Sequence, residues 1–206
     1  MYIPRIHKND NFEEIKSFVE DNGFGIIISQ DVGIISATHI PMQLKVFNDE
    51  WYLYGHLAKG NPQWKQFSEH QEVLVIFQGP HSYISSSWYD HINVPTWNYI
   101  AVHLSGKIRI QTPNELEDTV VDLVEKYEQK SKQPFSIESM KREDFKKQLA
   151  GIVGFEIKIT KIEGKKKLSQ NRNSTDFNNI IKKLDESKNW EAQQVANEMR
   201  KLKNNP

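Results

Sequence analysis

Short β-type segments fill most of this chain, and they constrain the fold more than any other feature. Six or seven runs rich in branched and aromatic residues are separated by turn residues. They are FGIIIS, GIISATHI, QLKVF, EWYLYGHL, EVLVIFQG, AVHLSGKIRI and, later, GFEIKITKIEG. A parallel sheet needs a helix between most of its strands, and most of these connections are too short to hold one. The pattern therefore predicts a mainly β fold with some helix, built on an antiparallel barrel.

Helical periodicity appears at the start of the chain, before the last β-type segment and after it. In DNFEEIKSFVEDNG, Asp10 is expected to cap the helix and Gly23 to end it. In TPNELEDTVVDLVEKYEQ, Thr112 stands as the N-cap with Glu115 three residues later. The segment REDFKKQLAG predicts a shorter helix, and two more helices are expected on either side of SKN near the C-terminus.

The composition excludes several classes of protein. The chain has no cysteine, which rules out disulfides, thiolate metal sites and a cysteine nucleophile. No apolar run approaches the ~18 residues of a membrane-spanning helix. The N-terminal MYIPRIHKND lacks the apolar segment of a signal peptide. We therefore expect a cytoplasmic protein with no membrane partner.

Charge is balanced over the whole chain but not along it. The 27 Lys and Arg residues equal the 27 Asp and Glu residues. From residue 156 to the end, 12 basic residues stand against 7 acidic ones. Two explanations fit this basic tail equally well: an anionic partner, and helix faces exposed to solvent.

Several common site motifs are missing. The chain has no GxGxxG or P-loop sequence for phosphates and no GxSxG around a serine. None of the seven histidines is paired with another at the four-residue spacing of a helical metal site. His39, His56, His81 and His103 lie in or beside predicted strands and would converge only through the fold. We therefore predict no metal site.

Two segments have the chemistry of a binding site. In GHLAKGNPQW a strand turns into a short helix, where Ala58 and Gly60 leave room for an anion at the backbone N–H groups. Lys59 adds a positive charge and Asn61 is suited to cap the helix. The aromatic and polar stretch from Gly79 to Tyr99 suits a flat ligand. An ordinary chain corner and a hydrophobic cluster or dimer contact explain the same two segments, so both alternatives stay open.

Four motifs together resemble one family. GHLAKGNPQW, VLVIFQGPHSYISSSWY, VPTWNY and KLSQNR occur in the order and spacing of the PaiB family. Members of that family are described as FMN-binding negative transcriptional regulators, linked in bacilli to sporulation and degradative-enzyme genes. The resemblance covers essentially the whole chain. It implies a homodimer with FMN at the subunit interface, with DNA as a further candidate partner.

The resemblance also implies a fold and its domains. The fold is an FMN-binding split β-barrel of the pyridoxamine-phosphate-oxidase type. On this basis we expect a split-barrel domain over residues 1–172 with a helical insertion at about 113–150. Residues 173–206 are expected to form a C-terminal helical extension.

A set of FMN-binding residues follows from the same resemblance. SATHIP and HLAKGN stand where such barrels hold the flavin phosphate. PTWNY would come from the partner subunit, and SQNR would close the site. The residues assigned in this way are Ser36, Thr38, His39, His56, Ala58, Lys59, Asn61, Trp97, Asn98, Gln170 and Arg172.

Two enzymatic or cofactor alternatives compete with regulation. A flavin reductase or oxidase would use the aromatic segment as a substrate wall, while the flavin carries the electrons. A haem-binding or haem-degrading protein of the same fold is suggested by the histidines. No residue pattern names a general acid or base, so no catalytic residue is assigned.

Overall fold

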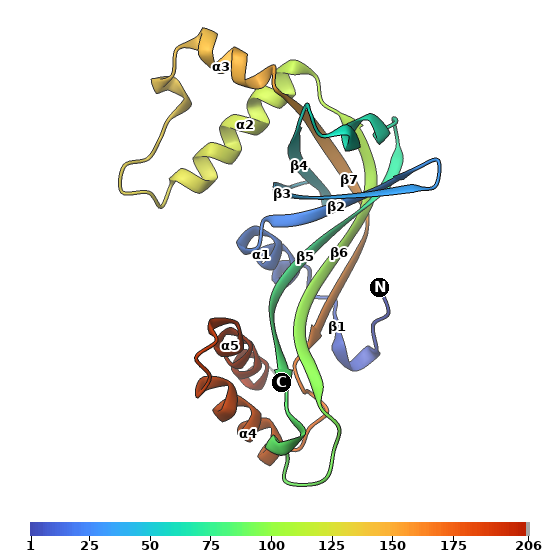
Figure 1. Cartoon of the computed structure of the whole chain (residues 1–206), viewed down its shortest axis with the longest axis vertical. Helices are drawn as coiled ribbons and strands as arrows, with labels where there is room; N and C mark the ends of the chain where they lie inside the picture. The colour runs from blue at the N-terminus through green and yellow to red at the C-terminus, as the bar shows by residue number, and fades with distance from the viewer. Residues whose placement is uncertain (205–206) are drawn as a thin grey trace. The chain divides into compact units, whose positions relative to one another are not determined.

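The computed structural model describes residues 1–204, with side chains for residues 1–202 (Figure 1). The strands are β1 (Lys8–Asn9), β2 (Phe24–Asp31), β3 (Ile34–Phe47), β4 (Glu50–Ala58), β5 (Gln71–Ile84), β6 (Thr96–Ile110) and β7 (Ile152–Lys167). The α-helices are α1 (Phe12–Asp21), α2 (Pro113–Glu128), α3 (Arg142–Leu149), α4 (Ser174–Asp185) and α5 (Trp190–Asn204). Among these described helices, none is both long and apolar enough to cross a membrane.

The chain folds into two compact units. We call residues 19–77 and 103–162 the barrel unit. Residues 1–18, 78–102 and those from 163 onward form the second, which we call the helical unit. Strands β5, β6 and β7 are each divided between the two units.

Antiparallel pairing closes the sheet of the barrel unit. The strand order is β7-β4-β3-β2-β5-β6, and β6 pairs again with β7. Closure brings β6 and β7 very close, because a Cβ added to Gly106 would lie 2.4 Å from the carbonyl oxygen of Lys158. Only glycine fits there without a shift of the backbone. The inward side chains are apolar and almost fully buried: Ile27, Met42, Leu53, Leu57, Val75, Phe77, Leu104, Ile108, Phe155 and Ile157. The predicted antiparallel barrel is confirmed.

Strand β3 joins two segments that the sequence presented as separate. Residues 34–41 of β3 pair with β2, and residues 42–47 pair with β4. Pro41 lies at the point of change, opposite Phe24 at the end of the β2 ladder. A proline has no N–H to donate, so it is tolerated where a ladder ends. β3 is therefore one continuous strand that pairs first with β2 and then with β4.

Helix α2 begins as predicted and packs beside the barrel. Thr112 and Glu115 form the expected capping box. The Arg109 guanidinium donates to Glu115 and to Glu156 of β7, at 2.8 Å in each case. These bonds join α2 to β6 and β7. The Arg109 hydrogen bonds lower the pKa of Glu115 to about 2.

Helix α1 begins one residue later than predicted. Asn11, not Asp10, caps it: the Asn11 side-chain oxygen accepts from the N–H groups of Glu13 and Glu14 at 3.1 and 3.2 Å. The Asp10 carboxylate lies instead 2.9 Å from the Lys8 ammonium. Either residue type can cap a helix, and the cap falls to the one directly before the first helical residue.

In the helical unit, α4 and α5 share one hydrophobic cluster with Ile84 of β5, Ile100 of β6, and Tyr89 and Leu168, which lie outside the strands. The buried members are Ile84, Tyr89, Ile100, Leu168, Ile180, Leu184, Ala192, Val195, Ala196 and Met199. Both C-terminal helices are confirmed, and their apolar faces are covered within the chain. The domain boundary at residue 173 stays a prediction, and the end of that domain, residues 205–206, lies outside the described residues.

Candidate functional site

A buried glutamine organises a polar network inside one end of the barrel unit. Gln63 is 2% exposed and lies in the short helix η2 (Pro62–Gln66). Its Nε2 donates to the carbonyl oxygen of Ile27 at 3.2 Å, and to Ser29 Oγ and the carbonyl oxygen of Ser36 at 3.1 Å each. Its Oε1 accepts from the Thr38 hydroxyl. The side chain is thus fully used in joining η2 to β2 and β3.

The turn before η2 is tied into the same network. Asn61 Nδ2 donates to Thr38 Oγ1 at 2.9 Å. Its Oδ1 accepts from the Gln63 N–H at 3.0 Å and caps η2, as the sequence predicted. Gln66 Nε2 donates to Ser36 Oγ at 2.9 Å. The structure therefore brings together three of the predicted residues, Ser36, Thr38 and Asn61.

Sequence reasoning missed Gln63 and Gln66, which link these three residues. A signal was present, because residues three apart in a 3₁₀-helix lie on the same face. Two glutamines at that spacing, directly after the Asn61 cap and Pro62, present paired amides to one side. Glutamine is common on protein surfaces, however, and only the fold shows that this side faces inward.

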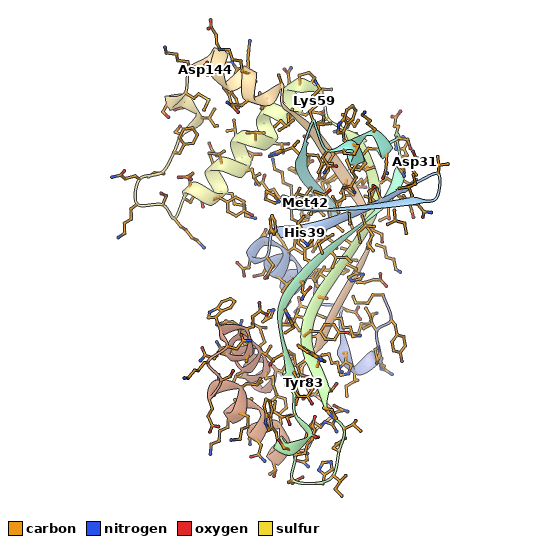
Figure 2. The ribbon with its side chains drawn as sticks, in the orientation of Figure 1. Asp31, His39, Met42, Lys59, Tyr83 and Asp144 are labelled. Carbon is orange, nitrogen blue, oxygen red and sulfur yellow. The ribbon has the colours of Figure 1, made fainter. Side chains whose placement is uncertain are left out.

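Two backbone N–H groups of the turn donate hydrogen bonds to carbonyl oxygens of the protein itself. The Lys59 N–H donates to the carbonyl oxygen of Gly151 at 2.8 Å, and the Asn61 N–H to that of Ala58 at 2.9 Å. The expectation that the turn offers its backbone amides to an anion is therefore wrong for these two groups. The Lys59 side chain is exposed (Figure 2), and no heavy atom lies within 4 Å of a Cβ added to Gly60. An anion can thus approach the turn from this side and meet the Lys59 ammonium.

The outer face of β2, β3 and β5 is apolar and open. Phe24 is 64% exposed, and its ring stacks on that of His39 with centroids 6.2 Å apart. Ile35 is 69% exposed. The half-buried side chains beside them are Ile26, Ile28, Leu74 and Ile76. A hollow of about 260 Å³ lies on this face, lined by Ile28, Ser29, Gln30, Ile35, Glu72, Val73, Leu74 and Ser105. Such a surface suits a flat ring or a second apolar surface.

His56 does not join the polar network. It alternates on β4 with the buried Leu57, so its side chain points to the outside of the barrel. It lies opposite Gly154, where an added Cβ would lie 2.8 Å from Leu116 of α2. His56 Nδ1 is buried and has no hydrogen-bond partner among the described residues. Burial lowers the pKa of His56, which favours the neutral side chain in the folded protein.

The remaining predicted residues lie in the helical unit. Trp97 is 52% exposed, with its ring 6.1 Å from that of His81 and 6.0 Å from that of Tyr83. Asn98 is fully buried, and its amide exchanges two hydrogen bonds with the Ser169 hydroxyl, of 3.0 and 3.1 Å. Trp97 therefore presents its ring to the surface, while Asn98 is used in packing this unit.

Gln170 and Arg172 come together at the start of α4. Gln170 Oε1 accepts from the Leu168 N–H at 2.8 Å and lies 3.1 Å from His7 Nδ1. The Arg172 guanidinium lies over the ring of Tyr89, 4.7 Å from its centroid. Both residues line a hollow of about 330 Å³, together with Ser174, Phe177, Asn178 and Leu202.

Comparison with known proteins identifies the family. Residues 1–161 match the family model described as "Putative FMN-binding domain". The chain belongs to this family. It is also 46% identical over 196 residues to the protease synthase and sporulation protein PAI 2 of Bacillus subtilis, and the alignment covers 95% of each chain. The resemblance to the PaiB family is thus confirmed, and FMN is the cofactor of this FMN-binding family.

Solved structures of low sequence identity share the fold. An FAD- and haem-binding protein from Mycobacterium smegmatis superposes with a TM-score of 0.60 at 14% identity, over 78% of this chain and 73% of the other. A flavocytochrome from Azotobacter vinelandii gives a TM-score of 0.56 at 13% identity, over 80% and 72%. Together with the closed strand order, these likenesses confirm the split β-barrel.

The lowered pKa of His56 predicts a pH-dependent stability. An unfolded histidine has a pKa near ~6.5. Near and below this pH, His56 therefore binds a proton more readily in the unfolded chain than in the folded chain. The free energy of unfolding therefore falls as the pH drops through this value, by at most about 1.4 kcal/mol per pH unit from this residue. We expect His56→Gln to lose less stability between about pH 7 and about pH 5 than the wild type, as measured by urea unfolding.

His70→Asn is the matched control, because His70 is exposed and its positive φ of 64° is tolerated by asparagine. This variant should follow the pH dependence of the wild type. The same loss of stability in His56→Gln and the wild type would contradict the assignment.

Proposed function

We propose that this protein is a PaiB-type FMN-binding negative transcriptional regulator of sporulation and degradative-enzyme genes, acting in the cytoplasm. The observation that carries the proposal is the 46% identity to the sporulation protein of Bacillus subtilis, which extends over 95% of both chains. Membership of an FMN-binding family supports the flavin part. The regulatory part of the proposal rests on the name of that relative.

The residues of the barrel unit fit an FMN phosphate and ring. Lys59 supplies an exposed cation beside the open Gly60 turn. The hydrogen bond from Asn61 to Thr38 fixes that turn to β3, directly before His39. The stacked rings of His39 and Phe24 offer a flat exposed surface. We infer that Lys59 binds the phosphate, while the outer face of β2 and β3 receives the ring.

Lys59→Ala is expected to weaken FMN binding roughly 10- to 100-fold, because a hydrogen bond to a charged group contributes about 1.5–3 kcal/mol. Quenching of flavin fluorescence on titration measures the affinity. Lys65→Ala is the matched control: Lys65 belongs to η2, and its ammonium lies 6.0 Å from the Trp64 ring centroid. Equal FMN affinities for the two variants would exclude Lys59 as the phosphate ligand.

We further propose that a second copy of the chain covers the outer face of β2, β3 and β5, with FMN between the subunits. The exposed Phe24 and Ile35 and the row of half-buried isoleucines and leucine support this. Faces of this kind are rarely left open in soluble monomers. The homodimer implied by the family resemblance needs such a surface.

Ile35→Glu should shift the protein from dimer to monomer and lower its affinity for FMN, because a charge is costly to bury in an apolar interface. Light scattering on a size-exclusion column measures the mass. Val32→Glu serves as the control, since Val32 is 93% exposed in the turn between β2 and β3. A wild-type protein that elutes as a monomer in the presence of FMN would exclude the dimer.

The basic side chains of the C-terminal helices are largely held in ion pairs. Lys183 lies 2.9 Å from Glu186, and Arg200 pairs with Asp185. The chain as a whole has no net charge. Both observations argue against a strong general attraction to DNA, so any DNA binding is expected to depend on a local surface.

If regulation acts through direct DNA contact, the purified protein should retard a DNA fragment from the promoter of its own gene. The complex should survive an excess of random DNA and dissociate as the salt concentration rises. An electrophoretic mobility shift assay at several salt concentrations measures this. Equal affinity for promoter and random DNA would exclude direct repression.

A further inference from the structure

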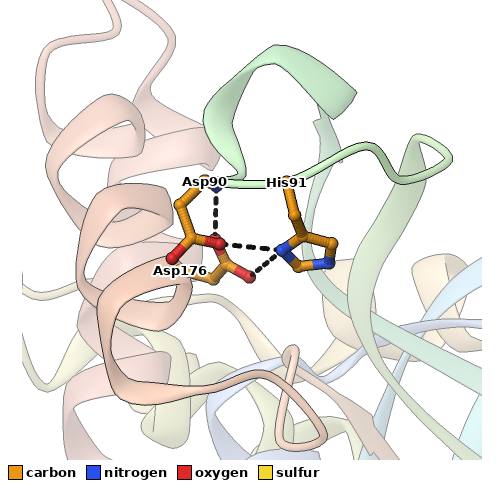
Figure 3. Close-up of side chains that lie close together, drawn as sticks. All are labelled: Asp90, His91 and Asp176. Atoms are coloured by element: carbon orange, nitrogen blue, oxygen red, sulfur yellow. Dashed lines mark hydrogen bonds and ion pairs between the residues drawn. The ribbon is translucent and has the colours of Figure 1, made fainter.

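One histidine of the helical unit lies between two carboxylates (Figure 3). His91 Nδ1 is 2.8 Å from Asp90 Oδ1 and 3.3 Å from Asp176 Oδ2. The three ligand atoms all lie within 4.8 Å of one another. Asp90 and His91 belong to the loop before β6, whereas Asp176 lies in the first turn of α4. The cluster therefore connects two elements that are 86 residues apart in the sequence.

The buried member of this cluster is rigidly held. Asp176 is fully buried. Its Oδ1 accepts from the Asp90 N–H at 2.8 Å, and Asn173 Nδ2 lies 3.3 Å from its Oδ2. Asn173 also caps α4 by accepting from the Asp176 N–H at 2.8 Å. These bonds orient Oδ2 toward His91 without supplying a positive charge.

The charges of the cluster do not balance. Among the described residues, the ion pair recorded for Asp176 is the one with His91. An imidazolium would neutralise only one of two converging carboxylates, whereas a divalent cation beside a neutral imidazole would neutralise both. Burial of a carboxylate that stays unneutralised is costly.

The surroundings leave room for a further ligand. A hollow of about 470 Å³ lies over the cluster, lined by Ser86, Ser87, Tyr89, Asp90, His91, Ile92 and Asn93. Tyr89 is 8% exposed, and its ring centroid lies 6.0 Å from that of His91. Its hydroxyl is buried and has no hydrogen-bond partner among the described residues. A buried hydroxyl without a partner indicates a polar group or water missing from its neighbourhood.

The donor set selects the class of ion. One imidazole nitrogen and two carboxylate oxygens suit a divalent transition ion, whereas Mg²⁺ and Ca²⁺ prefer oxygen ligands alone. With zinc–ligand bonds of about 2.0–2.2 Å, ligand atoms of a tetrahedral site lie about 3.3 Å apart. The distance from His91 Nδ1 to Asp176 Oδ2, 3.3 Å, equals this separation. The 2.8 Å to Asp90 Oδ1 is that of a hydrogen bond, whose proton the ion would replace.

We propose that Asp90, His91 and Asp176 form a zinc-binding site with three protein ligands and a fourth position open to the hollow. The ion fastens the loop before β6 to α4. None of these three ligands is among the residues predicted to bind FMN, so zinc binding can be tested in the absence of FMN.

The test uses the full-length protein, stripped of metal with a chelator and titrated with Zn²⁺ against a chromophoric zinc indicator. We expect one high-affinity zinc ion per chain and a higher melting temperature with zinc. Co²⁺ in place of Zn²⁺ should give the visible absorption bands of a tetrahedral site. His91→Ala and Asp90→Asn, both at exposed positions, should each weaken zinc binding at least about 10-fold.

His81→Ala is the matched control, because His81 Nδ1 lies 3.0 Å from a single carboxylate, that of Glu191, in the same unit. It should bind zinc like the wild type. Circular dichroism checks that each variant is folded, and Asp90→Asn provides the test if His91→Ala is not. A wild type that binds no zinc at one equivalent, or a folded His91→Ala or Asp90→Asn variant with wild-type affinity, would overturn the proposal in favour of a simple ion pair.

Discussion

Closure of the sheet between β6 and β7 is the constraint on which the barrel unit depends. Strand β7 pairs with β4 on one side and with β6 on the other, so the sheet has no free edge there. The near-contact at Gly106 shows how little space closure leaves. With the sheet closed, its inward side chains form an apolar core with the Gln63 network at one end, and the outward ones divide between a part covered by α2 and an open apolar part.

Within that barrel, the buried amide of Gln63 decides where the turn at Gly60 stands. The Gln63 amide donates hydrogen bonds to β2 and β3, and the Gln63 N–H joins the turn through the Asn61 cap. A buried amide with all its partners holds these segments in one arrangement, since any shift would leave a polar group unsatisfied. The exposed Lys59 therefore follows a turn that is held in place, which suits the phosphate-binding role proposed for it.

Sequence reasoning found the strands, most of the helices and the family, because these depend on local patterns and on motifs in order. It placed Asn61 correctly as a cap, since capping is decided within three residues. It grouped His56 with Thr38, although the two side chains lie on different faces of the closed sheet. It placed Asn98 near the flavin, which stays a prediction, and it did not foresee that this side chain is buried and bonded to Ser169. Both differences arise because burial is decided by distant parts of the chain.

The sequence by itself determined the β-rich class, the capped helices and the membership of an FMN-binding family. Only the tertiary structure decided which polar residues point inward and which outward, because strand alternation fixes two faces but not which one is buried. It alone placed Asp176 against Asp90 and His91, since residues so far apart in sequence meet only when α4 packs in the helical unit. Local chemistry can thus be read from neighbouring residues, whereas a site assembled from distant ones exists only in the folded chain.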